Sequence, residues 1–235
     1  MDKRITLVTG ASRGIGRAAA LALAAAGHHV VATARTTGAL EELDDMIGER
    51  GGTATLVPLD LKDMQATHQL GYVIAERYGR LDGLFANAGV LGEITPASQV
   101  VPKTWDEVIA VNLTANVNLI RALDPVLRES PSGRAVFTTS GVAKSRRPYW
   151  SAYAASKAGL EAFVQCYARE VEVTDLRVNL LNPGATATAM RAKAMPGEDP
   201  ATLPRPEDVA PLVVEMLSPD WTGNAEIVSY RERTA

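Results

Sequence analysis

The chain has 235 residues, the length of one α/β domain with a full hydrophobic core. Its 46% hydrophobic and 22% charged residues are typical of a globular protein, and a net charge of -3 argues against nucleic acid or an anionic membrane as a partner. The single Cys166 excludes an intrachain disulfide and a cysteine-based zinc site, and the three histidines lack metal-ligand spacing, so no metal is expected.

The apolar segments bear on the cellular compartment. The segment within residues 1–10 is too short for a secretory signal peptide, and the longest apolar run, at 18–26, is far below the ~20 residues of a membrane span. We therefore expect a soluble, cytoplasmic protein. Because Cys166 lies in a predicted helical run, we interpret it as a small core residue rather than a reactive thiol.

Strand and helix patterns alternate along the chain. Short β-branched and apolar runs predict strands at 4–9, 29–34, 53–59, 81–86, 134–139, 176–181 and 225–230. Helices are predicted from the first glycine-rich turn to 26, at 38–50, at 63–78, from 102 within 99–128, around Tyr153, and at 206–217. A loop at 185–205 is interpreted as a mobile segment over a site, and 231–235 as a charged tail. The alternation predicts a single α/β domain over 1–235: a parallel sheet of about seven strands with helices on both faces.

The sequence TGASRGIG at 9–16 follows the first strand and opens the first helix. Its glycines, Gly10, Gly14 and Gly16, lack the Cβ that would block close approach of the backbone to a pyrophosphate. The amides and dipole at a helix N-terminus favour the negative charge of such a group. The order strand, turn, helix therefore indicates dinucleotide binding, with an ordinary tight turn as the alternative.

The end of the second strand bears on the choice of dinucleotide. NAD-binding folds place an acidic residue about 20 positions after the glycines, whereas an Arg nearby accommodates the 2′-phosphate of NADP. Here Arg35 lies 19 residues after Gly16, and no carboxylate follows until Glu41. Arg13, inside the glycine turn, can converge on the same phosphate, which suits the guanidinium fork. The pattern favours NADP(H) over NAD(H), and the alternative is two solvated surface arginines.

Polar and glycine residues also follow three later strands, at the end where open parallel sheets bind ligands. These residues are Asn87, Ala88 and Gly89, then Ser140 and Gly141, then Pro183 and Gly184. Asn112 lies inside the long helix predicted from 102, although Asn is a poor residue for a helix interior. Helix propensity leaves open whether Asn112 marks a kink or has a function.

Tyr153 and Lys157 are four residues apart in an Ala-rich run, so we expect them to share one helix face. A phenol has a pKa of about 10, and a positive charge on the next turn lowers that pKa. The pair is therefore expected to act as an acid/base group poised near working pH. Tyr-x3-Lys alone also fits an ordinary helix surface, so the hypothesis depends on the surrounding motifs.

Together these motifs resemble the short-chain dehydrogenase/reductase family. The match runs from about residue 4 to 218 and consists of TGASRGIG, the Asn-Ala-Gly tripeptide, Asn112, Ser140, the Tyr-x3-Lys pair and the Pro-Gly pair, in the family's order and spacing. Within the family, the chain is similar to bacterial 3-oxoacyl-acyl-carrier-protein reductase-like members. The resemblance implies a Rossmann-type, doubly wound α/β fold and an oxidoreductase that uses NADP(H).

The resemblance also implies a role for each matched residue. At the reaction site, Ser140 would bind the substrate carbonyl and Tyr153 would transfer the proton. Lys157 would bind the nicotinamide ribose and lower the pKa of Tyr153, and Asn112 would hold a water that links Lys157 to solvent. The cofactor would be bound by Gly10, Ser12, Arg13, Gly14, Ile15, Gly16, Arg35, Asp60, Leu61, Asn87, Ala88, Gly89, Tyr153, Lys157, Pro183, Gly184, Thr186 and Thr188. Hydride transfer to a carbonyl builds negative charge on oxygen, which Ser140 and Tyr153 would stabilise.

The chain departs from the family pattern at three places. Ala86 stands where Asn commonly precedes the tripeptide, with little expected effect. The usual Asp-Gly-Gly ending is missing after the last strand, which leaves the C-terminal subunit contact open. The loop at 185–205 has no pattern for a steroid, a sugar or an acyl carrier, so the substrate stays open.

Side chains near the predicted site allow two interpretations each. Trp150, Met190 and Met195 either form an apolar pocket wall or pack in the core. Arg146 and Arg147 either attract an acidic substrate or are solvated charges.

The leading hypothesis is an NADPH-dependent reductase of a small-molecule carbonyl, reversible as an alcohol dehydrogenase. Its long helices would pair in a homodimer or homotetramer. The alternative is an NADP(H)-binding regulator without turnover, against which the intact Ser140, Tyr153, Lys157 and Asn112 argue. An epimerase or dehydratase fits less well, because such chains resemble longer two-part proteins with another glycine spacing.

Overall fold

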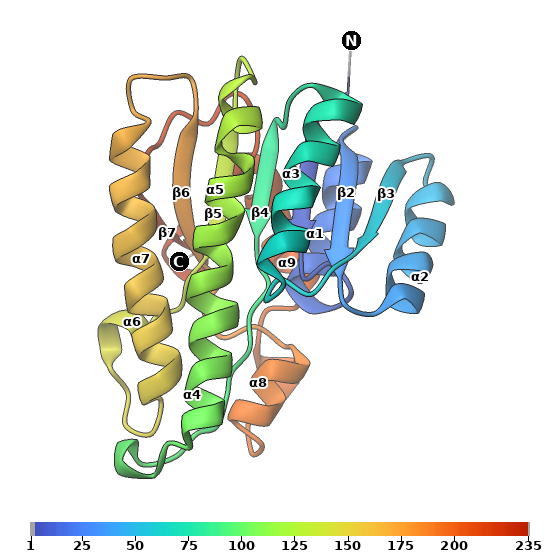
Figure 1. Cartoon of the computed structure of the whole chain (residues 1–235). Helices are drawn as coiled ribbons and strands as arrows, with labels where there is room; N and C mark the ends of the chain where they lie inside the picture. Colours follow the sequence, from blue (N-terminus) through green and yellow to red (C-terminus); the bar gives the residue numbers. More distant parts are fainter. Residues whose placement is uncertain (1–2, 235) are drawn as a thin grey trace.

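A computed structural model describes residues 3–234 of the chain (Figure 1). Its centre is one sheet of seven parallel strands in the order β3-β2-β1-β4-β5-β6-β7. The strands are β1 (Ile5–Thr9), β2 (His29–Ala34), β3 (Thr53–Pro58), β4 (Gly83–Ala86), β5 (Arg134–Thr138), β6 (Arg177–Asn182) and β7 (Ile227–Ser229). The α/β fold and the seven strands predicted from the alternating pattern are confirmed.

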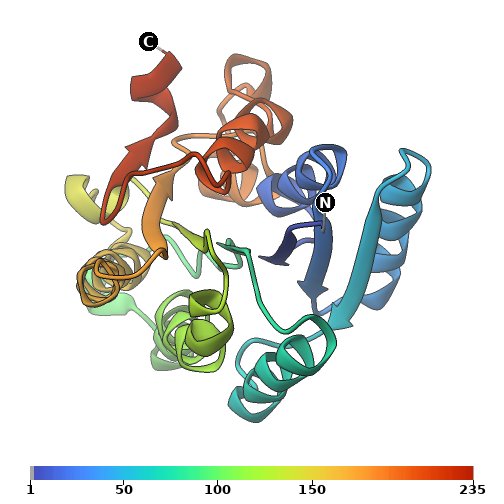
Figure 2. The same cartoon turned by 90° about the horizontal axis from the view of Figure 1, so that it is seen from above.

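Helices cover both faces of the sheet, as the view along the strands in Figure 2 shows. One face carries α1 (Gly14–Ala25), α2 (Thr37–Gly48) and α9 (Pro206–Met216), and the other carries α3 (Met64–Tyr78), α5 (Ala115–Arg128) and α7 (Ser151–Glu170). Each face has its own apolar core. The shorter helices are α4 (Pro102–Ile109), α6 (Val142–Ser145), α8 (Ala189–Ala194) and α10 (Tyr230–Thr234).

The central strands are buried on both sides. Every residue of β1, β4 and β5 is buried, as expected for apolar strands between two helical layers. The strand order reverses between β1 and β4, and open α/β sheets bind ligands outside the carboxyl ends of the strands at such a point. The glycine turn follows β1 and the Asn-Ala-Gly segment follows β4, so both lie at this crevice.

Three segments differ from the predicted elements. The long helix from 102 is divided into α4 and α5 by a π-helical turn at Ala110–Thr114. The loop at 185–205 contains α8 and a 3-10 turn, and its ends are joined by a hydrogen bond from Ala187 N to Pro204 O at 2.8 Å. The charged tail forms α10, and its last residue, Ala235, lies outside the described residues.

The prediction that Cys166 is a core residue is wrong. The Cys166 side chain is exposed, because it lies on the outward face of α7 with Ala155, Ala158 and Ala162, which follow the helical period. Within residues 3–234, no helix has the length and apolar character to cross a membrane. The same residues contain no group of three or more His, Cys, Asp or Glu side chains placed to hold a metal ion.

Candidate active site

The glycine turn after β1 packs directly against the segment after β4. A Cβ on Gly10 would lie 3.0 Å from the Cα of Ala88, and one on Gly16 would overlap the Gly10 carbonyl and approach Asn87 Nδ2 to 2.6 Å. Gly10 also has a φ of 66°, a conformation that L side chains rarely adopt. The turn therefore requires glycine at both positions, which keeps its backbone bare for close approach by a ligand.

Thr9, the last residue of β1, fastens the turn to the segment after β4. Its Oγ1 accepts hydrogen bonds from the main-chain N–H groups of Asn87 at 3.0 Å and Ala88 at 3.1 Å. Asn87 Nδ2 donates to the carbonyl of Thr9 at 3.3 Å, and Asn87 Oδ1 accepts from Thr138 Oγ1 at 3.5 Å. Asn87 thus joins the carboxyl ends of β1, β4 and β5. Gly89 lies two residues after Asn87, and a Cβ on Gly89 would lie 3.2 Å from Asn112 Oδ1.

The N-terminus of α1 is suited to a negatively charged ligand. Arg13 at the N-cap has extended backbone and makes no side-chain cap, and the first turn has no acidic residue. Ser12, Gly14 and Ile15 are partly exposed around this end. Thr188 lies opposite, with its Cγ2 3.5 Å from the Cβ position of Gly14. Uncapped amides without a competing carboxylate fit the pyrophosphate of a dinucleotide.

The residues predicted for the adenosine end follow three neighbouring strands. Arg13 lies in the turn after β1 and Arg35 directly after β2, and both side chains are exposed. Asp60 is exposed and Leu61 is buried just beyond β3. Because β1, β2 and β3 are adjacent in the sheet, these residues lie along one edge. Two accessible guanidinium groups at this edge fit a 2′-phosphate.

α7 brings Tyr153 and Lys157 to the carboxyl end of β5. Lys157 is 2% exposed, and its Nζ donates to the carbonyl of Thr138 at 2.7 Å. The same nitrogen is 5.8 Å from the centre of the Tyr153 ring. Ser140 lies two residues beyond β5, next to Tyr153, and its side chain acts to lower the pKa of the Tyr153 phenol. Ser140, Tyr153 and Lys157 thus lie close together, and Asn112, the fourth residue predicted for the reaction, lies near Lys157 beside Gly89.

Burial determines the ionisation of both groups on α7. Desolvation raises the pKa of Tyr153 to about 12, although the neighbouring Ser140 side chain acts to lower it. Desolvation also lowers the pKa of Lys157 to about 8, against the raising effect of Glu161. The expectation that Lys157 lowers the pKa of Tyr153 is therefore not met in this structure, because burial of the phenol outweighs its neighbours. Tyr153 is held as a neutral phenol, the form that donates a proton.

Asn112 is fully buried in the π-helical turn between α4 and α5. Its Oδ1 accepts from Val90 N at 2.8 Å, and its Nδ2 donates to Val90 O at 2.9 Å and to Ser156 Oγ at 3.0 Å. The helix is deformed at Asn112, and the side chain ties α7 to the segment after the Asn-Ala-Gly tripeptide. Such π turns occur often at functional sites. The water-mediated role of Asn112 stays a prediction.

The segment after β6 carries the remaining predicted cofactor residues. Gly184 has a φ of 71° and is exposed. Thr186 Oγ1 donates to the carbonyl of Pro183 at 3.3 Å. Thr188 Oγ1 accepts from Arg191 N at 3.2 Å and so caps α8. The two threonines thus shape the path from β6 to α8, opposite the glycine turn.

Tyr153 lies in an apolar cluster that also includes side chains of α8. The ring centres of Trp150 and Tyr153 are 6.0 Å apart, and Met190 and Met195 pack in the same cluster. Trp150, Met190 and Met195 pack with one another in this cluster, and the choice between a pocket wall and core packing stays open. The space next to the phenol is therefore apolar on this side.

Charged groups lie around the loop that follows α8. Arg191 Nη2 donates to Glu198 Oε1 at 2.7 Å, and this hydrogen bond lowers the pKa of the Glu198 carboxyl, as do the charges of Arg231 and Arg147. Arg231, on α10, packs over Gly184, where a Cβ would lie 3.3 Å from its Nε. The C-terminal helix therefore reaches the segment predicted to hold the nicotinamide.

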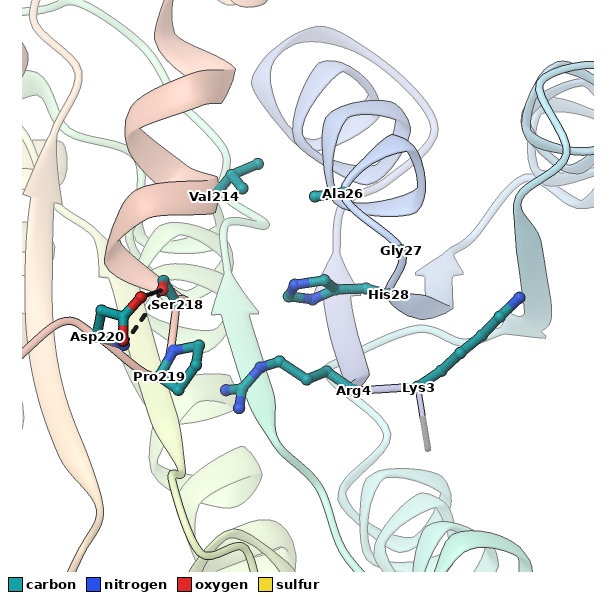
Figure 3. Close-up of a pocket in the computed structure, with 9 residues that line it drawn as sticks. All are labelled: Lys3, Arg4, Ala26, Gly27, His28, Val214, Ser218, Pro219 and Asp220. Carbon is teal, nitrogen blue, oxygen red and sulfur yellow. Dashed lines mark hydrogen bonds between the residues drawn. The ribbon is translucent and has the colours of Figure 1, made fainter. Parts of the chain in front are cut away.

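A cavity of about 440 Å³ lies at the other, amino edge of the sheet (Figure 3). Arg4, His28, Ser218 and Asp220 are among its lining residues. His28 Nδ1 is hydrogen-bonded to Thr6 Oγ1 at 2.8 Å, and the Ser218 hydroxyl faces Asp220. None of the predicted site residues lines this cavity, and they lie at the opposite, carboxyl edge of the sheet.

Sequence reasoning missed three residues that hold the site together: Thr9, Thr138 and Ser156. Each lies within or next to a motif found in the sequence, and this closeness was the signal that could have identified it. The partners described above, however, lie 19 to 79 residues away along the chain and cannot be read from local patterns.

Comparison with known proteins agrees with this geometry. Residues 4–199 match the family model described as short chain dehydrogenase. The chain is 42% identical over 223 residues to oxidoreductase YciK of Escherichia coli strain K12, covering 94% of this chain and 88% of that protein. It is 31% identical over 228 residues to the 3-oxoacyl-[acyl-carrier-protein] reductase FabG of Vibrio harveyi, covering 94% and 92%. A crystal structure of a short chain dehydrogenase from Shigella flexneri 2a, complexed with NADP, aligns with a TM-score of 0.94 at 39% identity and 98% coverage of both chains. The resemblance seen in the motifs is confirmed, and the chain belongs to the short-chain dehydrogenase family of oxidoreductases.

Proposed function

We propose that the protein is an NADPH-dependent reductase that converts a carbonyl group of a small molecule, such as a ketone, an aldehyde or a 3-oxoacyl-like compound, to an alcohol. The observation that carries this proposal is the convergence of Ser140, Tyr153 and Lys157 at the carboxyl edge of the sheet, beside the glycine turn. A neutral phenol next to a hydroxyl and an apolar cluster is suited to donating a proton to a carbonyl oxygen.

In the proposed reaction, each side chain of the site has a separate role. A reduced nicotinamide supplies the hydride to the carbonyl carbon when it is bound. The Ser140 hydroxyl and the Tyr153 phenol donate hydrogen bonds to the carbonyl oxygen as negative charge develops there. Tyr153 then gives its proton to that oxygen, and the Lys157 ammonium stabilises the phenolate that remains. Lys157 also binds the ribose, and Asn112 holds the water through which a proton returns from solvent.

NADP(H) is the cofactor of this proposal, in preference to NAD(H). The exposed Arg13 and Arg35 would bind its 2′-phosphate, and the relative solved with NADP supports this assignment. Asp60 and Leu61 would contact the adenine. The glycine-turn residues Gly10, Ser12, Gly14, Ile15 and Gly16 would bind the pyrophosphate, Asn87, Ala88 and Gly89 the riboses, and Pro183, Gly184, Thr186 and Thr188 the nicotinamide.

In the same proposal, the protein is cytoplasmic and forms a homodimer or homotetramer through the long helices that carry Asn112 and Tyr153. The outward face of α7 supports pairing, because its exposed Ala155, Ala158 and Ala162 allow a second helix to approach closely. Sedimentation of the protein as a monomer would contradict this assembly.

An NADP(H)-binding regulator without turnover is the second candidate. It is favoured by the position of α8, whose Met190 packs in the same apolar cluster as Tyr153. A regulator needs the cofactor residues but has no use for a proton donor, so the two candidates differ in what Tyr153 does.

The deciding experiment is NADPH oxidation, with NADH in parallel, across aldehydes, ketones, quinones and 3-oxoacyl thioesters. Turnover of one class that is lost in Tyr153→Phe supports the reductase and narrows its substrate. Tight NADPH binding with no turnover of any compound supports the regulator.

A further inference from the structure

Glu161 lies one turn beyond Lys157 on α7 and is bound to the same strand end. Its Oε1 accepts a hydrogen bond from Thr139 Oγ1 at 2.7 Å, while Lys157 Nζ donates to the carbonyl of Thr138 at 2.7 Å. Thr138 and Thr139 are consecutive, and Ser140 follows them directly. Lys157 and Glu161, four residues apart on α7, are therefore both attached to the short segment that ends in Ser140.

Lys157 is a buried ammonium whose surroundings are mostly neutral. It is 2% exposed, and its neighbours from other elements are the carbonyl of Thr138, the amide side chain of Asn112 near Gly89, and the backbone of Gly89 itself. Burying a charge without compensation is strongly unfavourable. A source of negative charge near Lys157 is therefore needed if the side chain is to stay an ammonium.

Glu161 is the carboxylate placed to supply that charge. Within the described part of the chain, the titratable groups that face Lys157 from α7, from the π-helical turn, from the segment after β4 and from the end of β5 are Tyr153 and Glu161. Burial keeps Tyr153 neutral to about pH 12, the pKa of its phenol. Glu161, by contrast, raises the pKa of Lys157 against the effect of desolvation.

We propose that Glu161 is a positioning residue of this reaction site: its carboxylate keeps the Lys157 side chain in the ammonium form, and its hydrogen bond holds Thr139 and with it the adjacent Ser140. This inference rests on the function proposed above, because it assigns Glu161 to the support of Lys157 and Ser140. The first effect requires the charge of the carboxylate, whereas the second requires only an acceptor oxygen.

Two substitutions separate these effects. Glu161→Gln keeps an acceptor oxygen for Thr139 and removes the charge, whereas Thr139→Val keeps the charge and removes the hydrogen bond. The titration of Lys157 is followed by NMR of the full chain labelled with 13C-lysine, and its signal is assigned by its loss in Lys157→Met. In the wild type the midpoint is expected near pH 8. Glu161→Gln is expected to lower that midpoint by about one pH unit, and Thr139→Val to leave it within a few tenths of a unit.

A binding measurement extends the test to the cofactor. NADPH affinity, followed by fluorescence between pH 7 and 9.5, is expected to weaken as Lys157 loses its proton, at a lower pH in Glu161→Gln than in the wild type. Glu161→Asp, which restores the charge, is expected to return the midpoint toward the wild-type value. Equal midpoints in the wild type and in Glu161→Gln would overturn the proposal, as would equal shifts in Glu161→Gln and Thr139→Val.

Neither measurement requires turnover. If no carbonyl compound is reduced, the function proposed above fails while the Lys157 titration remains readable. If carbonyl reduction is found but the Lys157 midpoint does not respond to Glu161, the inference about Glu161 fails and the reductase stands.

Discussion

The two edges of the sheet use buried charge in opposite ways. At the amino edge, Asp82 is 3% exposed and accepts a hydrogen bond from Ser130 Oγ at 2.6 Å and from the main chain of β1 at 2.9 Å. Arg4 beside it donates to three main-chain carbonyls, at 2.9, 3.0 and 3.1 Å. At the carboxyl edge, Lys157 is equally buried but donates to one carbonyl, that of Thr138.

The number of hydrogen-bond partners distinguishes a buried charge that stabilises the fold from one that is free to bind a ligand. Where a buried ion is surrounded by hydrogen-bond partners from several elements, its loss affects the fold. Where a buried ion keeps donors free, a ligand can supply the missing partners. The cavity in Figure 3 lies at the first kind of edge, and the candidate active site lies at the second.

The largest expected effect is at the carboxyl edge. Tyr153→Phe removes the proton donor without changing the shape of the ring, so we expect turnover to fall about 10³-fold while NADPH affinity stays within about threefold. Steady-state kinetics and NADPH fluorescence measure the two quantities. Tyr149→Phe, at a 58% exposed tyrosine four residues earlier, is the matched control and should retain full activity. Retained turnover in Tyr153→Phe would remove it from the acid/base role.

At the amino edge, we expect a substitution to lower the stability of the fold rather than the activity. Asp82→Ala removes the carboxylate that accepts hydrogen bonds from Ser130, Arg80 and the main chain of β1. We therefore expect a loss of about 3 kcal/mol in the free energy of unfolding. Urea denaturation measures this loss. Asp106→Ala, at an exposed position on α4, should change stability by less than about 0.5 kcal/mol. If Asp82→Ala were as stable as the wild type but turned over substrate more slowly, the buried charge at the amino edge would serve function rather than stability, and the comparison of the two edges would fail.

A smaller effect is expected at the adenosine end of the carboxyl edge. Arg35→Ala removes a charged donor to the 2′-phosphate, so we expect NADPH to bind about 10- to 100-fold more weakly while NADH binding is nearly unchanged. Dissociation constants for both cofactors provide the test. Arg50→Ala, at an exposed arginine after α2, serves as the control for net charge. Equal weakening of both cofactors would show that Arg35 does not bind the 2′-phosphate.

The smallest effect concerns pH at the amino edge. Desolvation, with the charge of Arg4 as a further cause, lowers the pKa of His28 to about 4, whereas an unfolded His has a pKa of about 6.5. As the pH falls from 6.5 to 4, the unfolded chain binds a proton that the folded chain does not. Stability is therefore lost across this window, by about 2 kcal/mol once solvent screening is allowed for, and the loss stops below pH 4. Urea denaturation at several pH values should show this slope in the wild type and a shallower one in His28→Gln.

Much of this molecule could be predicted from local patterns. Strand and helix periodicity, the glycine turn and the positions of polar residues after strands follow from chain geometry that acts over a few residues. The ends of helices were harder to place, because α8 and the π-helical turn at Asn112 depend on packing against α7 and the segment after β4.

By itself, the sequence determined the parallel α/β sheet, the dinucleotide-type turn and the pairing of Tyr153 with Lys157 on one helix, because each depends on a short periodic pattern. Only the tertiary structure decided the chemistry of that pair. Burial raises the pKa of Tyr153, where the sequence predicted a lower value. The packing of α7 leaves Cys166 exposed on its outward face and brings Glu161 to Thr139. Desolvation and contacts across elements depend on which faces meet, and no local pattern in the chain states which faces those are.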